Sequence, residues 1–134
     1  MAPVDDSDAP ALLALAPEVM ATYVAGLRAR DAARDREDAA HRHRVRGRLP
    51  EAVRYLVETC GATEVILFGS LARGTATTTS DVDLLVSSVG PLRLLDAAGS
   101  VSRILGAEPD LVAREAVRPE VAARIAAEGE VLHG

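Results

Sequence analysis

The chain has 134 residues and a mass of 14.0 kDa, a size that suits one domain with an appended segment. Hydrophobic residues make up 49% of it and aromatic residues only 2%, so the core must consist mainly of alanine, leucine and valine. The single cysteine, Cys60, excludes an internal disulfide and a multi-cysteine zinc site. The apolar runs are too short to span a membrane and the acidic first residues differ from a secretory signal, so we expect a soluble cytoplasmic protein.

Charge is distributed unevenly along the sequence. All 15 basic residues are arginines, and residues 23–54 contain nine of them against five acidic residues, although the net charge of the chain is −5. A net acidic chain argues against binding to duplex nucleic acid, and no aromatic side chains alternate with these arginines to stack on bases. We therefore expect no direct nucleic-acid contact and interpret the arginine-rich stretch as a solvated helical face or a surface for a protein partner.

The first 48 residues predict an acidic segment and a helical extension. Residues 1–10 are acidic and contain proline. From Leu12 to Leu27 apolar residues recur at three- and four-residue steps, which predicts a helix over about 11–48 with one apolar face. Pro50 suits the first turn of a new helix that ends before Gly61. We therefore expect an N-terminal extension over residues 1–48 and a domain over residues 49–134.

The sequence after Gly61 alternates between strand and helix patterns. It predicts strands at 64–68, 81–86, 110–112 and 131–132, and helices at 91–105 and 119–128. Ser70 is expected to cap a short helical turn that Gly74 ends. This alternation indicates an α/β fold, in which functional sites tend to lie at the ends of strands.

Two carboxylates, Asp81 and Asp83, stand at the start of the second predicted strand. Residues two apart on a strand share a face, with Cα atoms about 6.5–7 Å apart, so the two charges repel unless cations lie between them. Oxygen ligands of this kind suit Mg²⁺, and two such ions about 3.5–4 Å apart hold the attacking and leaving oxygens of a phosphoryl transfer. Alone, the pair is more typical of solvated acids at the edge of a loop.

The first predicted strand ends in Gly69 and Ser70. A glycine lets a phosphate approach the backbone, a serine donates a hydroxyl, and the N–H groups at the start of a helix attract anions. Alone, this dipeptide is more typical of an ordinary tight turn with a helix cap. A Walker A loop is excluded because the chain has no lysine, and no G-x-G-x-x-G is present. The combination of a phosphate-binding turn with two carboxylates is what indicates phosphoryl chemistry.

Gly69 and Ser70, a gap of ten residues, and then Asp81-Val82-Asp83 form a pattern that resembles the minimal nucleotidyltransferase domains of the DNA polymerase β superfamily. Residues 68–74 and 80–84 also match the longer G-S-x-A-R-G and S-D-x-D-L forms of this signature. The resemblance extends over residues from about 53 to 132. It implies a small nucleotidyltransferase fold with a mixed β-sheet flanked by helices, here with the N-terminal helical extension.

The resemblance also implies roles for these residues. Gly69 and Ser70 are expected to bind the β- and γ-phosphates of a nucleoside triphosphate, with ATP as the usual substrate. Asp81 and Asp83 are expected to bind two Mg²⁺ ions. Arg73 either neutralises triphosphate charge or pairs with a nearby acid.

A third carboxylate of the family lies on a neighbouring strand, where it helps to bind one metal ion and activates the incoming hydroxyl. Asp110 fits this place, and Glu108 is its rival. Pro109 departs from the β-branched residue that usually precedes the third aspartate.

Proteins of this family and size are typically antitoxins, so the resemblance implies the antitoxin of a type VII-like HEPN–MNT pair. It would transfer AMP from ATP to a tyrosine hydroxyl of the HEPN ribonuclease toxin, release pyrophosphate and so neutralise the toxin. The alternatives are an antitoxin that neutralises its toxin by binding alone, and a small-molecule nucleotidyltransferase of the kind that modifies antibiotics. The helix before Pro50 is expected either to dock the partner or to pair two subunits into a homo-oligomer.

Overall fold

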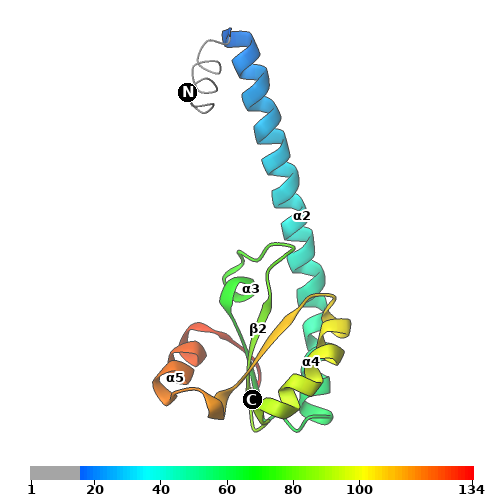
Figure 1. Ribbon diagram of the computed structural model, residues 1–134, viewed down its shortest axis with the longest axis vertical. Coiled ribbons are helices and arrows are strands. Elements are labelled where there is room, and N and C mark those ends of the chain that lie inside the picture. The colour runs from blue at the N-terminus through cyan, green and yellow to red at the C-terminus, as the bar shows by residue number, and fades with distance from the viewer. Residues whose placement is uncertain (1–15) are drawn as a thin grey trace, which may run out of the picture. The chain divides into compact units, whose positions relative to one another are not determined.

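The computed structural model describes residues 16–134 (Figure 1). The predicted acidic segment and the first residues of the predicted helix, up to residue 15, lie outside the described residues. The chain divides into two compact units, Met1–Glu37 and Asp38–Gly134. Among the described residues, no helix combines the length and the apolar character that crossing a membrane requires.

The first described helix, α2, covers Pro17–Glu58 without interruption. The prediction that a new helix begins at Pro50 is therefore wrong. Proline lacks the N–H that would bond to the carbonyl of Arg46, which costs a helix interior about 3 kcal/mol. Packing overrides this cost, because residues on both sides of the proline form one buried stripe at three- and four-residue spacing. The buried stripe consists of Val45, Leu49, Ala52, Val53 and Leu56.

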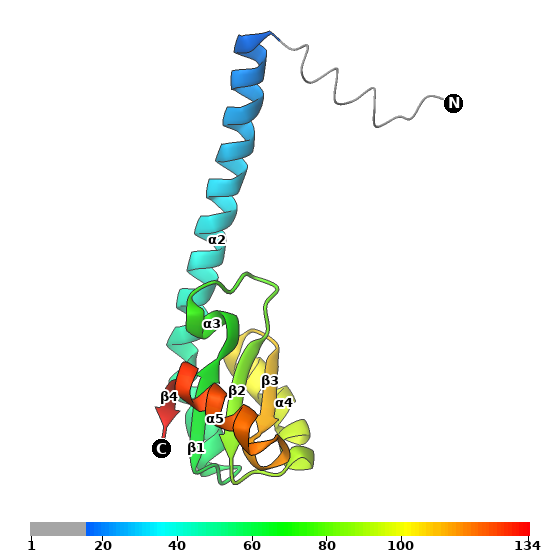
Figure 2. The same cartoon turned by 90° about the vertical axis from the view of Figure 1, so that its left-hand side faces the viewer.

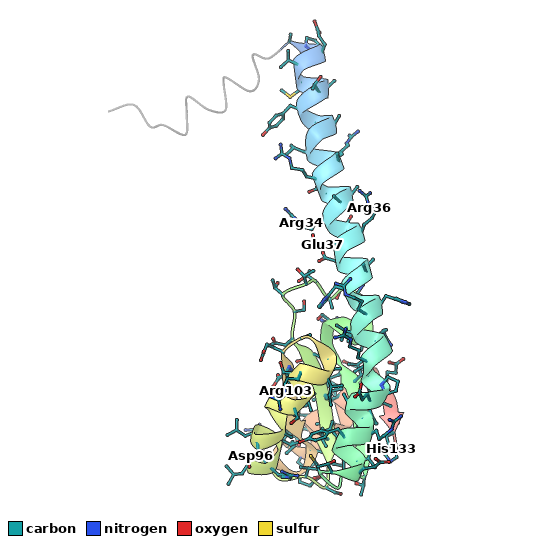
Figure 3. All side chains as sticks on the ribbon, turned by 90° about the vertical axis from the view of Figure 1, so that its right-hand side faces the viewer. Arg34, Arg36, Glu37, Asp96, Arg103 and His133 are labelled. Atoms are coloured by element: carbon teal, nitrogen blue, oxygen red, sulfur yellow. The ribbon has the colours of Figure 1, made fainter. Side chains whose placement is uncertain are left out.

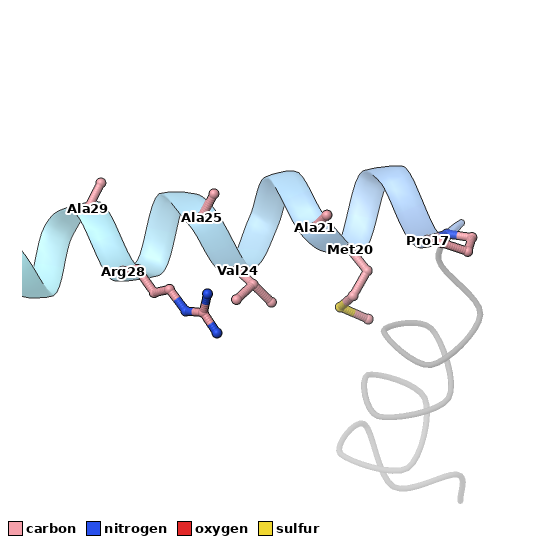
Figure 4. Close-up of a pocket in the computed structure, with 7 residues that line it drawn as sticks. All are labelled: Pro17, Met20, Ala21, Val24, Ala25, Arg28 and Ala29. Atoms are coloured by element: carbon pink, nitrogen blue, oxygen red, sulfur yellow. The ribbon is translucent and has the colours of Figure 1, made fainter.

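Within the unit Met1–Glu37, the helix is mostly exposed. Val19, Tyr23 and Leu27 lie on the predicted apolar stripe and are 40–50% exposed. Charged side chains such as Arg34 and Arg36 are also exposed, as expected of a solvated face (Figure 3). A hollow of about 750 Å³ runs along this part of α2, and the side chains of residues 16–134 that line it include no carboxylate and no hydroxyl (Figure 4). Its lining consists of Pro17, Met20, Ala21, Val24, Ala25, Arg28 and Ala29.

The unit Asp38–Gly134 contains a four-stranded sheet in the order β3-β2-β1-β4. β1 (Glu64–Phe68) pairs antiparallel with both β2 (Val82–Ser87) and β4 (Glu130–His133). β2 pairs parallel with β3 (Pro109–Ala113). The expected mixed α/β sheet flanked by helices is confirmed.

Helices cover both faces of this sheet. Residues 38–58 of α2 and helix α4 (Pro91–Leu105), which connects the parallel strands β2 and β3, lie on one face (Figure 1). Helix α5 (Pro119–Glu128), reached through the 3₁₀ turn η1 (Arg114–Ala116), crosses the other face (Figure 2). The predicted bounds of α4 and α5 agree with the structure.

Side-chain alternation along β2 assigns its residues to the two faces. Val82, Leu84 and Val86 belong to the main hydrophobic cluster, together with residues of α2 and α4. Because neighbouring residues on a strand point to opposite faces, Asp83 and Leu85 lie on the face that α5 partly covers. The carboxylate of β2 is therefore kept out of the main core.

The continuity of α2 through its proline can be tested by replacing Pro50 with alanine. Pro50→Ala restores the missing backbone donor without disturbing the buried stripe, because Pro50 itself is exposed. We expect the free energy of unfolding, measured by urea denaturation, to rise by about 1–2 kcal/mol. The exposed neighbour provides the control, since Glu51→Ala should change it by less than about 0.5 kcal/mol. A loss of stability in Pro50→Ala would contradict this account.

Candidate active site

Three chain segments meet at one end of the sheet. β1 ends there, whereas β2 and β3 begin there, because β1 runs antiparallel to β2 and β3 runs parallel to it. Phe68 is the register partner of Asp83, and Asp83 is the register partner of Asp110. The turn after β1 and the carboxylates of β2 and β3 therefore lie side by side at the same end of the sheet.

Gly69 lies in direct contact with the carboxylate of Asp83. A Cβ atom built at position 69 would lie 2.0 Å from Asp83 Oδ2, far inside any allowed contact. The backbone of Gly69 also has a φ angle of +75°, a conformation that residues with a side chain rarely adopt. Both facts require glycine here, and together they bring the backbone of the turn against the central carboxylate.

Helix α3 (Gly69–Arg73) begins directly at the end of β1. Its N-cap is Phe68, which makes no side-chain capping bond, so the prediction that Ser70 caps this helix is wrong. Ser70 is already the second helical residue, a position from which its hydroxyl cannot serve as a cap. Gly74 ends the helix as predicted, in the left-handed conformation, and its N–H donates to the carbonyl of Leu71.

Negative charge is concentrated around Asp83. Partial burial raises the pKa of this carboxyl above its usual value, and the neighbouring carboxylates of Asp110 and Asp81 raise it further. The Arg73 guanidinium acts in the opposite direction and lowers the same pKa. Asp81, Asp110 and Arg73 are exposed, so this cluster is open to solvent on its outer side. Such an arrangement attracts a cation.

The structure separates the two candidates for the third carboxylate. Glu108 accepts a hydrogen bond from the hydroxyl of Ser102 on α4 at 3.2 Å, so its side chain is directed away from Asp83. Asp110 lies beside Asp83 and contributes to its raised pKa. Pro109 is the first residue of the edge strand β3, a position at which a sheet tolerates proline.

Two hollows flank the carboxylates. One, of about 310 Å³, lies between α3 and α5 and is lined by Phe68, Gly69, Ala72, Arg73, Ile125 and Glu128. The other, of about 540 Å³, lies beside Asp81 and the end of α4, where Figure 3 labels Arg103. Its lining is Thr78, Thr79, Ser80, Asp81, Ser102, Arg103, Gly106, Ala107 and Glu108. Both hollows are large enough for part of a small substrate.

The donor set suits a hard divalent cation. Within residues 16–134, no three His, Cys, Asp or Glu side chains are gathered closely enough to form a complete metal site by themselves. Mg²⁺ rarely needs such a cage, because it keeps several waters and takes further oxygens from substrate phosphates. The crowded carboxylates of Asp83, Asp81 and Asp110 fit this mode of binding.

Sequence reasoning missed three side chains of α2 that contact this region. Asp38, Arg42 and Arg46 bond to the segment between Ser70 and Asp81. Their four-residue spacing is visible in the sequence and places them on one helix face. The sequence pattern predicts a solvated face or a surface for a protein partner, because it does not reveal which loop of the same chain packs against this face.

The contact between Gly69 and Asp83 can be tested with two alanine variants. Both Gly69→Ala and Gly74→Ala place a side chain on a residue with positive φ, which costs about 1–2 kcal/mol. Only Gly69→Ala also brings a Cβ against Asp83, since nothing lies within 4 Å of a Cβ at position 74. Urea denaturation should therefore show a loss of unfolding free energy that is larger by about 1 kcal/mol or more in Gly69→Ala. Equal losses of unfolding free energy would show that the carboxylate of Asp83 moves aside without lowering stability.

Comparisons with known proteins address the family and the fold of this chain. The family model of the nucleotidyltransferase domain matches residues 48–132. No curated protein sequence matches the chain significantly. A solved minimal nucleotidyltransferase is 32% identical, with a TM-score of 0.52 over 60% of this chain and 85% of the other.

Two solved toxin–antitoxin structures share the fold. One, with AMP-PNP, is 21% identical and has a TM-score of 0.56 over 63% of this chain and 73% of the other. The second, a mutant of MntA–HpeT, is 17% identical and has a TM-score of 0.54 over 63% of this chain and 72% of the other. At these identities the likeness concerns the fold alone. The family match, which covers more than half of the sequence, shows that the chain belongs to the nucleotidyltransferase domain family, as the resemblance of its motif predicted.

Proposed function

We propose that this protein is a Mg²⁺-dependent adenylyltransferase that acts as an antitoxin in the cytoplasm. It transfers AMP from ATP to a tyrosine hydroxyl of a HEPN ribonuclease toxin and so neutralises the toxin. The observation that carries the proposal is the contact of the Asp83 carboxylate with the backbone of Gly69, with Asp110 on the adjacent strand. This contact supports the proposal because it brings the turn at Gly69, which we propose binds phosphate, next to crowded carboxylates.

The residues at the end of β1 bind the triphosphate. Gly69 lets a phosphate approach the backbone, and Ser70, which is half-buried, donates its hydroxyl. Arg73 is exposed in the last turn of α3 and neutralises phosphate charge. Its influence on the pKa of Asp83 supports this role, because it shows that Arg73 acts on the same charge cluster.

The carboxylates bind the metal ions, and one of them also accepts the proton of the acceptor hydroxyl. Asp81 and Asp83 would hold two Mg²⁺ ions, with Asp110 as a further ligand; when bound, these ions supply positive charge for the attacking and leaving oxygens. The acceptor oxygen attacks the α-phosphorus, the bond from this phosphorus to the bridging oxygen breaks, and pyrophosphate leaves. Asp110, on the open side of the cluster, accepts the proton of the acceptor hydroxyl.

An acceptor on a partner protein suits this open site. Asp81 and Asp110 are exposed, so a side chain presented by another protein can reach them. A small acceptor would need a surface that encloses it, which these exposed carboxylates do not provide. The shared fold with solved toxin–antitoxin complexes, one of them with AMP-PNP, supports a toxin as the partner and an adenine nucleotide as the donor.

The proposal predicts a covalent change on the toxin. The protein is incubated with Mg²⁺, ATP and its HEPN partner, and intact-mass spectrometry is applied to both chains. We expect one or more AMP units on the partner, and none with Asp81→Asn/Asp83→Asn or after chelation of the metal. A tight complex without added mass would instead support an antitoxin that acts by binding, and AMP on an added antibiotic would support a small-molecule transferase.

A second pair of variants tests the third carboxylate. Asp110→Asn removes the proposed base, so the rate of AMP transfer should fall about 100-fold or more. Glu108→Gln should leave the rate nearly unchanged, since this side chain is bonded to Ser102. The reverse pattern in the same mass assay would assign the role to Glu108.

A further inference from the structure

Residues 74–81, called here the connecting loop, join α3 to β2. The loop begins beside Ser70, whose carbonyl accepts a hydrogen bond from Thr75 N at 2.9 Å, and it ends at Asp81. Its internal bonds are local, such as Thr77 N to Ser80 Oγ at 2.9 Å and Ser80 N to Thr77 O at 3.2 Å. Asp81 is thus held on one side by this loop, which leads back to the turn at Ser70, and on the other side by Val82, whose N–H donates to the carbonyl of Glu108 at 2.8 Å.

Two side chains of α2 hold the backbone of the connecting loop. Arg42 donates from Nη1 to the carbonyl of Ala76 at 2.7 Å, and the N–H of Thr78 donates to Asp38 Oδ1 at 3.1 Å. Asp38 and Arg42 are four residues apart, so they lie on the same face of the helix. They contact loop residues on either side of Thr77 and so oppose displacement of the middle of the loop.

Arg46 continues the same helix face by one more turn. Its Nη2 donates to the carbonyl of Leu71 in α3 at 3.2 Å, and its Nη1 pairs with Glu130 at 2.9 Å. Along the helix, Asp38, Arg42 and Arg46 stand at four-residue intervals. They bond in turn to Thr78, Ala76 and Leu71. The helix holds both the connecting loop and α3, which carries Ser70.

The bond from Arg42 is the one best placed to fix the loop. Ala76 is only 3% exposed and belongs to the hydrophobic cluster, whereas its neighbours Thr75 and Thr77 are exposed. Arg42 is half-buried, and a hydrogen bond from a charged donor in such surroundings is stronger than one between neutral groups. The buried centre of the loop is therefore held by a charged side chain from a distant part of the sequence.

We propose that Arg42, assisted by Asp38, is a positioning residue that holds the connecting loop so that Asp81 and Ser70 bind one metal–triphosphate together. This inference rests on the nucleotidyl transfer proposed above. Sites of this kind require their groups to be held within about 0.5 Å of the productive geometry. The proposed role of Arg42 and Asp38 also makes residues 38–48 part of the domain that carries the site, consistent with the compact unit Asp38–Gly134.

The test measures binding of α,β-methylene-ATP, which cannot transfer its AMP, by titration calorimetry with and without Mg²⁺. Arg42→Gln should weaken the Mg²⁺-dependent binding about tenfold, and Arg42→Lys, which keeps a charged donor, should recover part of it. Asp38→Ala should weaken it about threefold and serves as the second variant if Arg42→Gln fails to fold. Hydrogen exchange of the Thr78 amide should rise in both loss variants, while amides of β1 stay protected.

Matched controls lie on the same helix. Arg44→Gln and Asp35→Ala remove exposed charges that make no hydrogen bond to the part of the chain that the structure describes, so both should bind the analogue like the wild type. If Arg42→Gln and Asp38→Ala also bind like the wild type, the positioning role is wrong and the proposed function stands. If Arg42→Lys is no better than Arg42→Gln at equal stability, the positioning role is likewise wrong. A wild-type protein that binds no nucleotide would overturn both proposals.

Discussion

The carboxylate of Asp83 lies so close to the backbone of Gly69 that no side chain fits between them. This contact brings the end of β1 and the start of β2 together, and the parallel pairing of β3 adds Asp110 to the same edge. Partial burial, together with the resulting crowding of negative charge, raises the pKa of Asp83. The fold tolerates the crowding because the cluster lies at an open edge, on the sheet face opposite the main core.

Residues 38–58 of α2 contribute to the domain in two ways. Leu49, Leu56 and their buried neighbours supply one wall of the core and hold the helix on the sheet in spite of Pro50. The preceding turns supply Arg42 and Asp38, which bond to the loop between the phosphate-binding turn and the carboxylates. A stretch that looks like an appendage in the sequence is therefore part of the structure that shapes the site.

Local patterns predicted most of the fold and much of the candidate site. Proline in the first turn marked the start of α4 and α5, and side-chain alternation predicted the strand that carries Asp83, although β2 begins at Val82 and Asp81 precedes it. Prediction failed where distant contacts decide the outcome. The helix continues through Pro50 because of core packing, and the partners of Arg42 become visible only once the loop has folded back against α2.

The parallel pairing of β2 and β3 has a consequence for the order in which the site forms. Asp81 and Asp83 leave the ribosome well before Asp110, because the parallel connection between β2 and β3 runs through α4. β3, the strand that brings the third carboxylate beside Asp83, is synthesised late, and only β4 follows it among the strands of the sheet. A nascent or truncated chain that ends within α4 thus carries the signature motif without Asp110 beside Asp83, so the charge around Asp83 is complete only when β3 has paired.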